Sequence, residues 1–484
     1  MARDLDSGEK GYGGYSEEFW SSLSVIHSPL ADPIDQLIEL MKFEIIQREE
    51  EGYDMDSARE VFRNLIKEKN YSKILEFYSS LNGYPMRMGF QYSEPVDYSS
   101  IVSESIGGST VFDIEQSDDM LYDRIYGGWL GRCIGCMLGK PVEGLTHEMI
   151  SRWLELAGEY SLRDYFPDVE LESSEIPQWL SVRLENLRRH YREKGYGVLR
   201  GQVDRVVRDD DIDYTILNLH IAKIYGYSFT TMDIAEKWLS TLPYCQVYTA
   251  ERIAYRNLVN GVLPPKTATY MNPFREWIGA QIRADLWGYI APGLPTVAAE
   301  FAYRDASLSH VKNGVYGEMF VSAMISAAFA TDDVYDVVRV GLSVIPQRSR
   351  LAEAIRDVVS WSRESRDYWE TFRKIVGKYG CYNPIHTIVN AAIVVASLLH
   401  GNGDFERTII LAVLSGFDTD CNGATAGSIV GVMMGSNKLP RGWSIQLNDR
   451  VESYIAGYND ARISELAKQT LEIAKRIRST YSKG

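Results

Sequence analysis

Residues 415–433 read SGFDTDCNGATAGSIVGVM, and this stretch joins two acidic side chains to the start of an apolar helix. Asp418 and Asp420 flank one residue at the point where the helical pattern begins. The pattern continues through the apolar residues Ile429, Val430, Val432 and Met433. Small residues between these parts allow close packing of helices or close approach of a ligand, and they are Gly423, Ala424, Ala426, Gly427 and Gly431. The stretch predicts a closely packed helix with an acidic start.

Two carboxylates one residue apart at the mouth of a helix favour a cation, because hard divalent ions bind oxygen ligands. A calcium helix–loop–helix does not fit, since it needs more oxygen ligands and a distal glutamate. Taken alone, the pair Asp418 and Asp420 is weak evidence for a metal.

A second acidic cluster, RDDDID, occupies residues 208–213 and directly precedes another amphipathic helical pattern. Acidic residues at a helix start can simply cap free N–H groups and complement the helix dipole. Capping needs one or two carboxylates, whereas here Asp209, Asp210, Asp211 and Asp213 are four within five positions. So many anions repel one another unless a cation or basic groups neutralise them. Metal binding and an exposed acidic cap both remain open for this cluster.

A third segment, GCMLGKPVEG at residues 135–144, is rich in glycine. It can be a helix end followed by a turn, and it does not match the phosphate loop G-x-x-x-x-G-K-[ST]. Cys133 and Cys136 are spaced like a zinc or redox pair, but no second pair or neighbouring histidine completes a tetrahedral site. The sequence disfavours a zinc or redox role here.

The overall composition is that of a folded, acidic protein. Its 484 residues include 51 Lys and Arg against 66 Asp and Glu, a formal charge of -15. This balance repels a phosphate backbone, so nucleic-acid binding is not expected. Five scattered cysteines, no apolar leader and no long uninterrupted apolar stretch predict a soluble cytoplasmic protein without a membrane span.

Helical periodicity dominates the chain and predicts an all-α fold. Apolar residues recur at spacings of three and four, as in Leu37, Ile38, Met41 and Ile45, and again in Ile388, Ala391, Val395 and Leu398. Alternating strand patterns are not convincing anywhere. Residues 1 to about 30 are expected to be a loosely ordered arm, and residues 97–119 a linker. We therefore predict an N-terminal arm and helical extension over 1–117 and a catalytic domain over 118–484.

Taken in chain order, the three segments resemble the ADP-ribosylglycohydrolase family. That family carries G-D-x-x-G-x-x-x-E, then T-D-D-T before a helix, then G-x-D-T-D-T. The matching residues are Gly135, Gly139 and Glu143 for the first motif, Asp210 and Asp211 for the second, and Gly416, Asp418, Thr419 and Asp420 for the third. GAQIRAD at 279–285 is similar to the family's G-x-x-M-R loop, and Ser309-His310 to its T-H. The resemblance covers about residues 123–435 and extends into the helical tail, but not 1–117.

The chain departs from the family pattern at four positions. Asp209 and Ile212 stand where the second motif has threonines, Cys421 replaces a metal-facing threonine, and Cys136 replaces an aspartate. A thiol is a softer ligand than a hydroxyl and suits Mg²⁺ poorly. The resemblance therefore implies two cations, but a substrate different from the family's best-known ones.

The resemblance implies an orthogonal helical bundle whose central cleft holds two Mg²⁺ or Mn²⁺ ions. The implied metal ligands are Asp209, Asp210, Asp211, Asp418 and Asp420. Glu143 is the implied general base, and Asp211 is a second catalytic carboxylate. Gly279, Arg283 and His310 would line the ligand side, although His310 can equally be a structural histidine.

The implied reaction is cleavage of a C1 ribosyl bond in an ADP-ribose-like small molecule or an ADP-ribosylated macromolecule. Two other functions stay open. One is an N-glycosidase for a small nucleoside-like metabolite, which a pocket without diphosphate donors would favour. The other is a catalytically inactive, metal-stabilised scaffold or binding protein. The retained Glu143 and motif aspartates argue against the scaffold.

Overall fold

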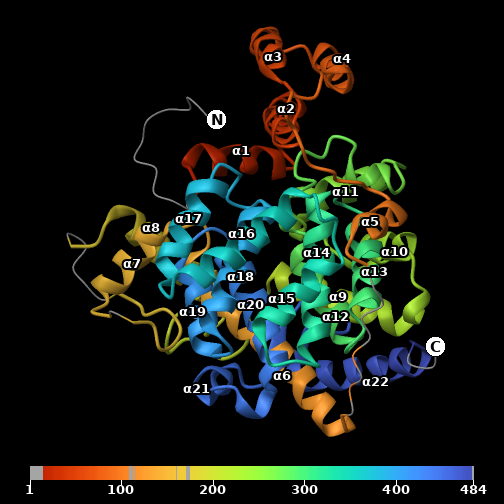
Figure 1. The fold of residues 1–484 in the computed structure, drawn as a ribbon. Coiled ribbons are helices and arrows are strands. Elements are labelled where there is room, and N and C mark those ends of the chain that lie inside the picture. Colours follow the sequence, from red (N-terminus) through yellow and green to blue (C-terminus); the bar gives the residue numbers. More distant parts are fainter. Residues whose placement is uncertain are drawn as a thin grey trace.

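The computed structural model describes residues 15–107, 112, 114, 116–159, 161–169 and 175–481. Helices make up most of this part of the chain, so the predicted all-α fold is confirmed (Figure 1). The N-terminal helices are α1 (Glu17–His27), α2 (Pro33–Glu50), α3 (Asp56–Glu68), α4 (Tyr71–Ser80) and α5 (Tyr98–Glu104). The next helices are α6 (Asp118–Gly139), α7 (His147–Leu156), α8 (Gln178–Tyr191), α9 (Asp210–Tyr225), α10 (Thr231–Thr241) and α11 (Thr249–Val259).

The second half of the chain is equally helical. Its helices are α12 (Asp285–Tyr289), α13 (Pro295–Ala306), α14 (Asn313–Ala328), α15 (Val334–Ser343), α16 (Arg350–Glu364), α17 (Tyr368–Tyr379), α18 (Thr387–Gly401), α19 (Phe405–Leu414), α20 (Thr419–Met434), α21 (Arg441–Ser444) and α22 (Ile463–Tyr481). Two short strands, β1 (Arg450–Glu452) and β2 (Asp460–Arg462), pair antiparallel between α21 and α22. They are too short to produce an alternating sequence pattern.

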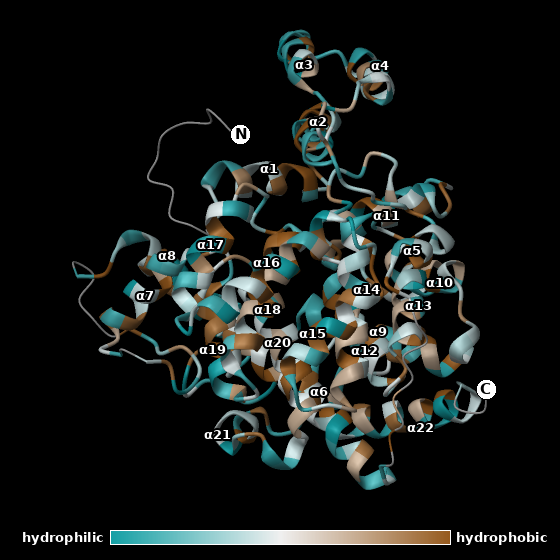
Figure 2. Ribbon diagram, in the orientation of Figure 1, coloured by the Kyte–Doolittle hydropathy of each residue, from teal (hydrophilic) through white to brown (hydrophobic). Residues whose placement is uncertain are grey.

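The centre of the fold is the pair α6 and α20, whose residues are buried on all sides along most of their length. Apolar residues gather on these central helices, whereas the outlying α3 and α4 are more hydrophilic (Figure 2). Helices that are apolar all round belong in the core of a large protein. The surrounding helices therefore pack on this pair. One of them is α22, whose Thr470 hydroxyl accepts a hydrogen bond from Nε1 of Trp129 on α6 at 3.1 Å.

Glycines bring the two central helices into backbone contact. In α6 they recur every four residues, which places them on one face of the helix. A Cβ built at Gly127, Gly131 or Gly135 would lie 1.9–2.2 Å from the carbonyl oxygen of Gly431, Gly427 or Gly423, respectively. At the helix end, a Cβ on Gly139 would lie 2.2 Å from the carbonyl oxygen of Thr419. No side chain fits between the helices at these positions.

This contact makes α6 and α20 antiparallel, because the end of one helix meets the start of the other. Gly139 at the end of α6 touches Thr419 at the start of α20, and the hydroxyl of Thr419 donates to the Gly139 carbonyl at 2.8 Å. The loop that follows α6 carries Glu143, and the residues that open α20 are Asp418 and Asp420. Helix packing alone therefore brings the first and third motifs together.

The N-terminal region differs from the expectation of a loose arm up to about residue 30. Residues Glu17–His27 form α1, whose start is capped by Ser16 through its side chain. Leu23 and Ile26 of α1 are buried with Phe274 and Trp277 of the main body. Residues Tyr98–Glu104, expected to be part of a linker, form α5. Both helices are held by tertiary packing, which local composition does not reveal; residues 1–14 lie outside the described part of the chain.

Buried ion pairs fasten α2 to the main body of the protein. Arg275 pairs with Glu44 at 2.8 Å and with Glu51 at 2.7 Å. Gln47 on α2 donates to Glu276 at 2.7 Å, and Arg350 pairs with the same carboxylate at 2.7 Å. Breaking such a buried pair by removing one partner is strongly destabilising. The helical extension is thus joined to the fold by satisfied buried charges as well as by apolar contact.

The contact between α6 and α20 predicts that Gly135→Ala destabilises the protein. The added methyl group would meet the Gly423 carbonyl, which is backbone and cannot move aside. We expect a loss of about 3 kcal/mol in the free energy of unfolding, the upper end for over-packed cores, measured by chemical denaturation. Gly377→Ala on α17 is the control, since nothing lies within 4 Å of its added Cβ. There a gain of about 0.5–1 kcal/mol is expected. Equal effects at both positions would contradict the packing argument.

Candidate active site

Three chain segments meet where α6 ends. They are the turn Lys140–Val142 with Glu143 behind it, the start of α9 with Asp209 as its capping residue, and the start of α20. Asp209 accepts from the backbone N–H of Asp211 at 3.0 Å through one oxygen. Asp418 stands in the corresponding place on α20 but makes no side-chain capping bond. The capping explanation therefore holds for Asp209 and not for Asp418.

The two acidic clusters, about 200 residues apart in the chain, form one continuous group of possible ligands. Asp211, Asp420 and Cys421 each offer a ligand atom, and these atoms lie within 4.8 Å of one another. The same limit holds for Glu143, Asp418 and Asp420, and for Cys136, Asp209 and Asp211. Asp420 and Asp211 each belong to two of these groups, so the three groups are linked.

Asp210 is the one predicted metal ligand that belongs to none of these three groups. It opens α9 and is half-buried beside Asp209. Burial and the charge of Asp209 raise the pKa of Asp210 well above its usual range. Asp210 therefore interacts electrostatically with Asp209. Its role as a metal ligand stays a prediction.

The carboxylates are buried and repel one another. The exposed fraction is 2% for Asp209, 1% for Asp211, 5% for Asp418 and 4% for Asp420. Burial, together with Asp420 and Glu143, raises the pKa of Asp418 well above its usual range. Burial and the charge of Asp420 raise the pKa of Glu143 to about 8. The protein places these acids where their charged forms need further compensation.

Two basic side chains provide part of that compensation. Arg132 on α6 is fully buried and pairs with Asp211 at 2.9 Å and with Asp285 at 2.7 Å. Lys140 pairs with Asp209 and, although burial opposes it, holds the pKa of that carboxyl at about 2. Sequence analysis missed both roles. Lys140 lies inside the first motif and could have been noticed, whereas nothing in the sequence marks Arg132 as a partner of Asp211.

Two buried carboxylate oxygens of the linked ligand groups have no hydrogen-bond partner among the described residues. Asp211 Oδ2 and Asp420 Oδ1 are buried, and no hydrogen-bond donor of the described residues reaches them. A buried acceptor left unsatisfied costs about 1–3 kcal/mol, and more when it is charged. Both oxygens belong to residues of the linked ligand groups. The residues present therefore fit oxygen-binding divalent cations, with the thiols of Cys136 and Cys421 as the two softer donors beside them.

The residues predicted to line the ligand side form a separate buried network. Arg283 pairs with Glu251 at 2.9 Å and with Asp305 at 3.3 Å, and its side chain is fully buried. A Cβ on Gly279 would lie 2.2 Å from Glu251 Oε1. His310 is also buried, and its Nδ1 lies 2.8 Å from the hydroxyl of the neighbouring Ser309. The structure brings Gly279, Arg283 and His310 together but gives Arg283 protein partners of its own.

This network is connected to the carboxylates through backbone contacts. Arg132, the partner of Asp211, also donates to the carbonyl oxygen of Ile282 at 2.5 Å. Asn218 on α9 donates to the carbonyl oxygen of Arg283 at 3.1 Å. The segment 279–285 is thus fixed relative to α6 and α9, and it can orient the acidic site without touching a ligand.

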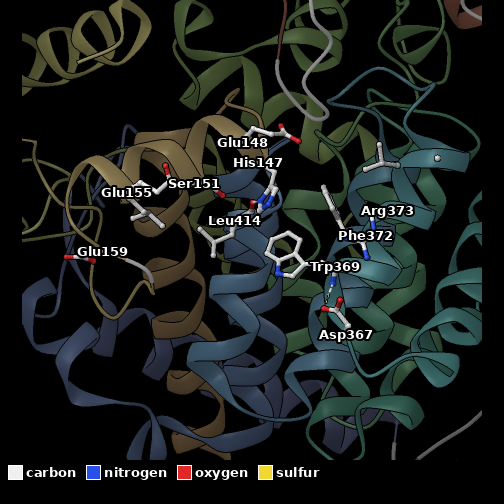
Figure 3. A pocket seen from close by; sticks show the side chains of 13 residues that line it. His147, Glu148, Ser151, Glu155, Glu159, Asp367, Trp369, Phe372, Arg373 and Leu414 are labelled. Carbon is white, nitrogen blue, oxygen red and sulfur yellow. Dashed lines mark hydrogen bonds between the residues drawn. The ribbon is translucent and has the colours of Figure 1, made fainter. Parts of the chain in front are cut away.

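A hollow of 840 Å³ lies between α7 and α17 (Figure 3). His147 and Trp369 line it and pack against each other, with ring centroids 4.1 Å apart. Its rim carries Glu148, Glu155 and Arg373. None of the predicted catalytic, metal or ligand residues lines this hollow. The hollow is therefore distinct from the set of residues predicted from the sequence.

The fold is all-α, and its buried acidic side chains at two helix starts form linked groups that could hold metal ions. The chain belongs to the ADP-ribosylglycohydrolase family, because the family model of that description matches residues 117–480, more than half of the chain. It is accordingly a glycosyl hydrolase, and its family is metal-dependent.

Comparison with individual proteins adds less. A solved structure described as "ADP-ribosylglycohydrolase-related protein complex" is 18% identical to this chain, covering 74% of this chain and 99% of its own, with a TM-score of 0.44. A likeness this distant adds nothing to the family match. No curated protein matches the chain.

The unpartnered oxygen of Asp420 predicts that Asp420→Ala loses stabilisation by metal. Wild type should gain about 2.7 kcal/mol when Mg²⁺ or Mn²⁺ is 100-fold above its Kd. The variant should gain much less and should be no less stable than wild type without metal, because repulsion with Asp418 and Asp209 is relieved. Calorimetric melting with and without metal measures both effects.

Asp404→Ala is the matched control, since Asp404 caps α19 through its side chain. Loss of that cap should lower stability by about 1 kcal/mol whether or not metal is present. If Asp420→Ala responds to Mg²⁺ and Mn²⁺ as wild type does, Asp420 is not a metal ligand.

Proposed function

We propose that this glycosyl hydrolase uses a pair of divalent cations to cleave the C1 ribosyl bond of an ADP-ribose-type substrate. The observation that carries the proposal is the meeting of Glu143, Asp211, Asp418 and Asp420 in linked buried groups. The family match supports the ribosyl substrate, because family members act on ADP-ribose-type compounds.

Asp209, Asp210, Asp211, Asp418 and Asp420 would hold the cations. When bound, two divalent cations orient the vicinal hydroxyls of a ribose and lower the pKa of water. Arg132 positions Asp211 and Lys140 positions Asp209 by pairing with their carboxylates. The negative surroundings also tolerate the positive charge that develops at the anomeric carbon during glycoside cleavage.

Glu143 is the proposed general base, which takes the proton of the attacking water at its carboxylate. Arg183 fixes the loop that carries it, donating to the carbonyl oxygens of Pro141 at 2.8 Å and Glu143 at 2.7 Å. The side chain of Glu143 itself is half-buried, so it can meet a substrate at the edge of the group. Asp211 is the second carboxylate proposed to act in catalysis, with Oδ1 held by Arg132 and Oδ2 unpartnered.

Gly279, Arg283 and His310 are proposed to serve the ligand side indirectly. Because Arg283 is buried between Glu251 and Asp305, it would support the segment 279–285 beside α9. Other residues would make the direct contacts with the ligand. Gly279 lets the segment 279–285 approach Glu251, where no larger residue fits.

The reducing cytoplasm is the proposed place of action. All five cysteines are free, two of them exposed and three buried. Among the described residues, no helix has both the length and the apolar character that crossing a membrane requires. The acidic net charge of -15 is consistent with a small-molecule or protein-linked ribosyl substrate and not with a nucleic-acid backbone.

The thiol of Cys421 predicts a weaker preference for Mg²⁺ than a threonine would give. Its sulfur lies within 4.8 Å of ligand atoms of Asp211 and Asp420. Because Mn²⁺ tolerates soft donors better than Mg²⁺ does, Cys421→Thr should shift the ratio of the two Kd values toward Mg²⁺. A shift of roughly tenfold is expected, the scale seen when groups around a metal change. Calorimetric titration of both ions measures it.

Cys245→Thr is the control, because Cys245 is exposed and belongs to none of the ligand groups. It should leave both metal affinities unchanged. An unchanged ratio in Cys421→Thr would show that the thiol does not face the ions.

The proposed base predicts that Glu143→Gln loses hydrolysis and keeps ligand binding. An amide cannot accept the proton of water, so turnover should fall roughly 10²–10⁴-fold. The amide keeps the size and one acceptor of the carboxylate, so the affinity for ADP-ribose should change by less than about 1 kcal/mol. A ribose-release assay and calorimetry separate the two effects.

Glu148→Gln on α7 is the control, since Glu148 is exposed and lies outside the ligand groups. Its turnover should equal that of wild type. Near-normal turnover in Glu143→Gln would remove Glu143 from the mechanism. Loss of binding together with turnover would instead make Glu143 a ligand of the cations or a structural residue.

A further inference from the structure

Tyr15, at the beginning of the described chain, lies directly against the loop that carries Glu143. Its backbone N–H donates to the carbonyl oxygen of Gly144 at 3.1 Å. A Cβ on Gly144 would lie 3.0 Å from Tyr15 Cδ2 and 3.1 Å from Trp20 Cζ2. The rings of Tyr15 and Trp20 therefore cover the loop on the side of Gly144.

The position of Tyr15 is fixed by the helix behind it. Its ring packs on Phe19 and Trp20, with both centroid distances 5.1 Å. Phe19 in turn stacks on Trp277 of the main body at 6.0 Å and meets Phe43 of α2 edge-on at 6.1 Å. This chain of aromatic contacts positions Tyr15 on the site through α1.

The hydroxyl oxygen of Tyr15 is buried and makes no hydrogen bond to any described residue. Burial first, and then the charges of Asp418, Glu143 and Asp420, raise the pKa of Tyr15 well above its usual value. The phenol thus interacts electrostatically with the carboxylates of one ligand group, yet none of their oxygens accepts a hydrogen bond from its O–H. A buried hydroxyl without a partner is rare in a folded protein and calls for an explanation.

A ligand oxygen held between Tyr15 and the carboxylates explains this arrangement. The carboxylate oxygens that would otherwise accept the O–H are the atoms proposed to hold cations. A phenol in this place can donate to a neutral hydroxyl or ring oxygen, and a ribose presents several. Tyr15 also lies outside the residues 117–480 that match the family.

We propose that Tyr15 is a substrate-contacting residue whose O–H donates to a ribosyl oxygen bound beside Glu143 and Asp418. The N-terminal region thereby completes the ligand side of the site and contributes to substrate specificity. This inference rests on the proposed function, because it takes the ligand to be a ribosyl compound.

Tyr15→Phe tests the inference, since it removes one oxygen and keeps the aromatic packing. Calorimetric titrations would measure ADP-ribose and adenosine binding at saturating Mg²⁺, and Mn²⁺ binding without nucleotide. One neutral hydrogen bond contributes about 0.5–1.5 kcal/mol, so ribosyl affinity should fall roughly 2–10-fold. In a hydrolysis assay the loss should appear in KM more than in kcat. Mn²⁺ affinity and the melting temperature of the ligand-free protein should not fall, because the lost hydroxyl has no hydrogen-bond partner among the described residues.

Tyr98→Phe is the matched control, as Tyr98 is a half-buried tyrosine of the same N-terminal region that packs on Tyr303 at 5.0 Å. It should bind both nucleotides as wild type does. Wild-type affinity in Tyr15→Phe would overturn the inference and leave the proposed function intact. A lowered melting temperature with lowered Mn²⁺ affinity would also overturn it, by making the hydroxyl structural. A wild-type protein that binds neither ADP-ribose nor adenosine would contradict the proposed function itself, and this inference with it.

Discussion

Backbone contact between α6 and α20 is the constraint on which the rest of the structure depends. Four glycines on one face of α6 let the two helices approach until carbonyl groups fill the space that Cβ atoms would need. Because the helices run antiparallel, the end of α6 and the start of α20 meet at one point. The loop with Glu143 and the turn with Asp418 are therefore neighbours before any electrostatic interaction is considered.

The chemistry follows from the charge that this geometry concentrates. Carboxylates from α9 and α20 are buried together, and Arg132 and Lys140 pair with only Asp211 and Asp209 among them. Removing a charge from water is costly unless it is paired, so buried carboxylates without a paired basic side chain would gain from a bound cation. In the proposed function, divalent cations would supply that charge in a form that also activates a ribosyl bond toward water. In that proposal, the repulsion between buried carboxylates underlies both the stability gained from metal and the reactivity of the site.

The sequence predicted much of this because its signals are local. Apolar spacing identified the helices, and the density of aspartates at 209–213 exceeded what capping requires. Other features depend on contacts between distant residues. The pairing of Arg132 with Asp211, the burial of Arg283 between Glu251 and Asp305, and the packing of α1 have no local pattern. A polar, tyrosine-rich start resembled a loose arm, although tertiary contacts order it from Tyr15 onward.

The central claim is that the starts of α9 and α20 share a pair of cations, and anomalous diffraction from crystals grown with Mn²⁺ tests it most directly. The account predicts two Mn²⁺ peaks among Asp209–Asp211 and Asp418–Asp420, roughly 3.5–4 Å apart as in other binuclear sites. The absence of peaks there at millimolar Mn²⁺, with the carboxylates still gathered as described, would contradict it.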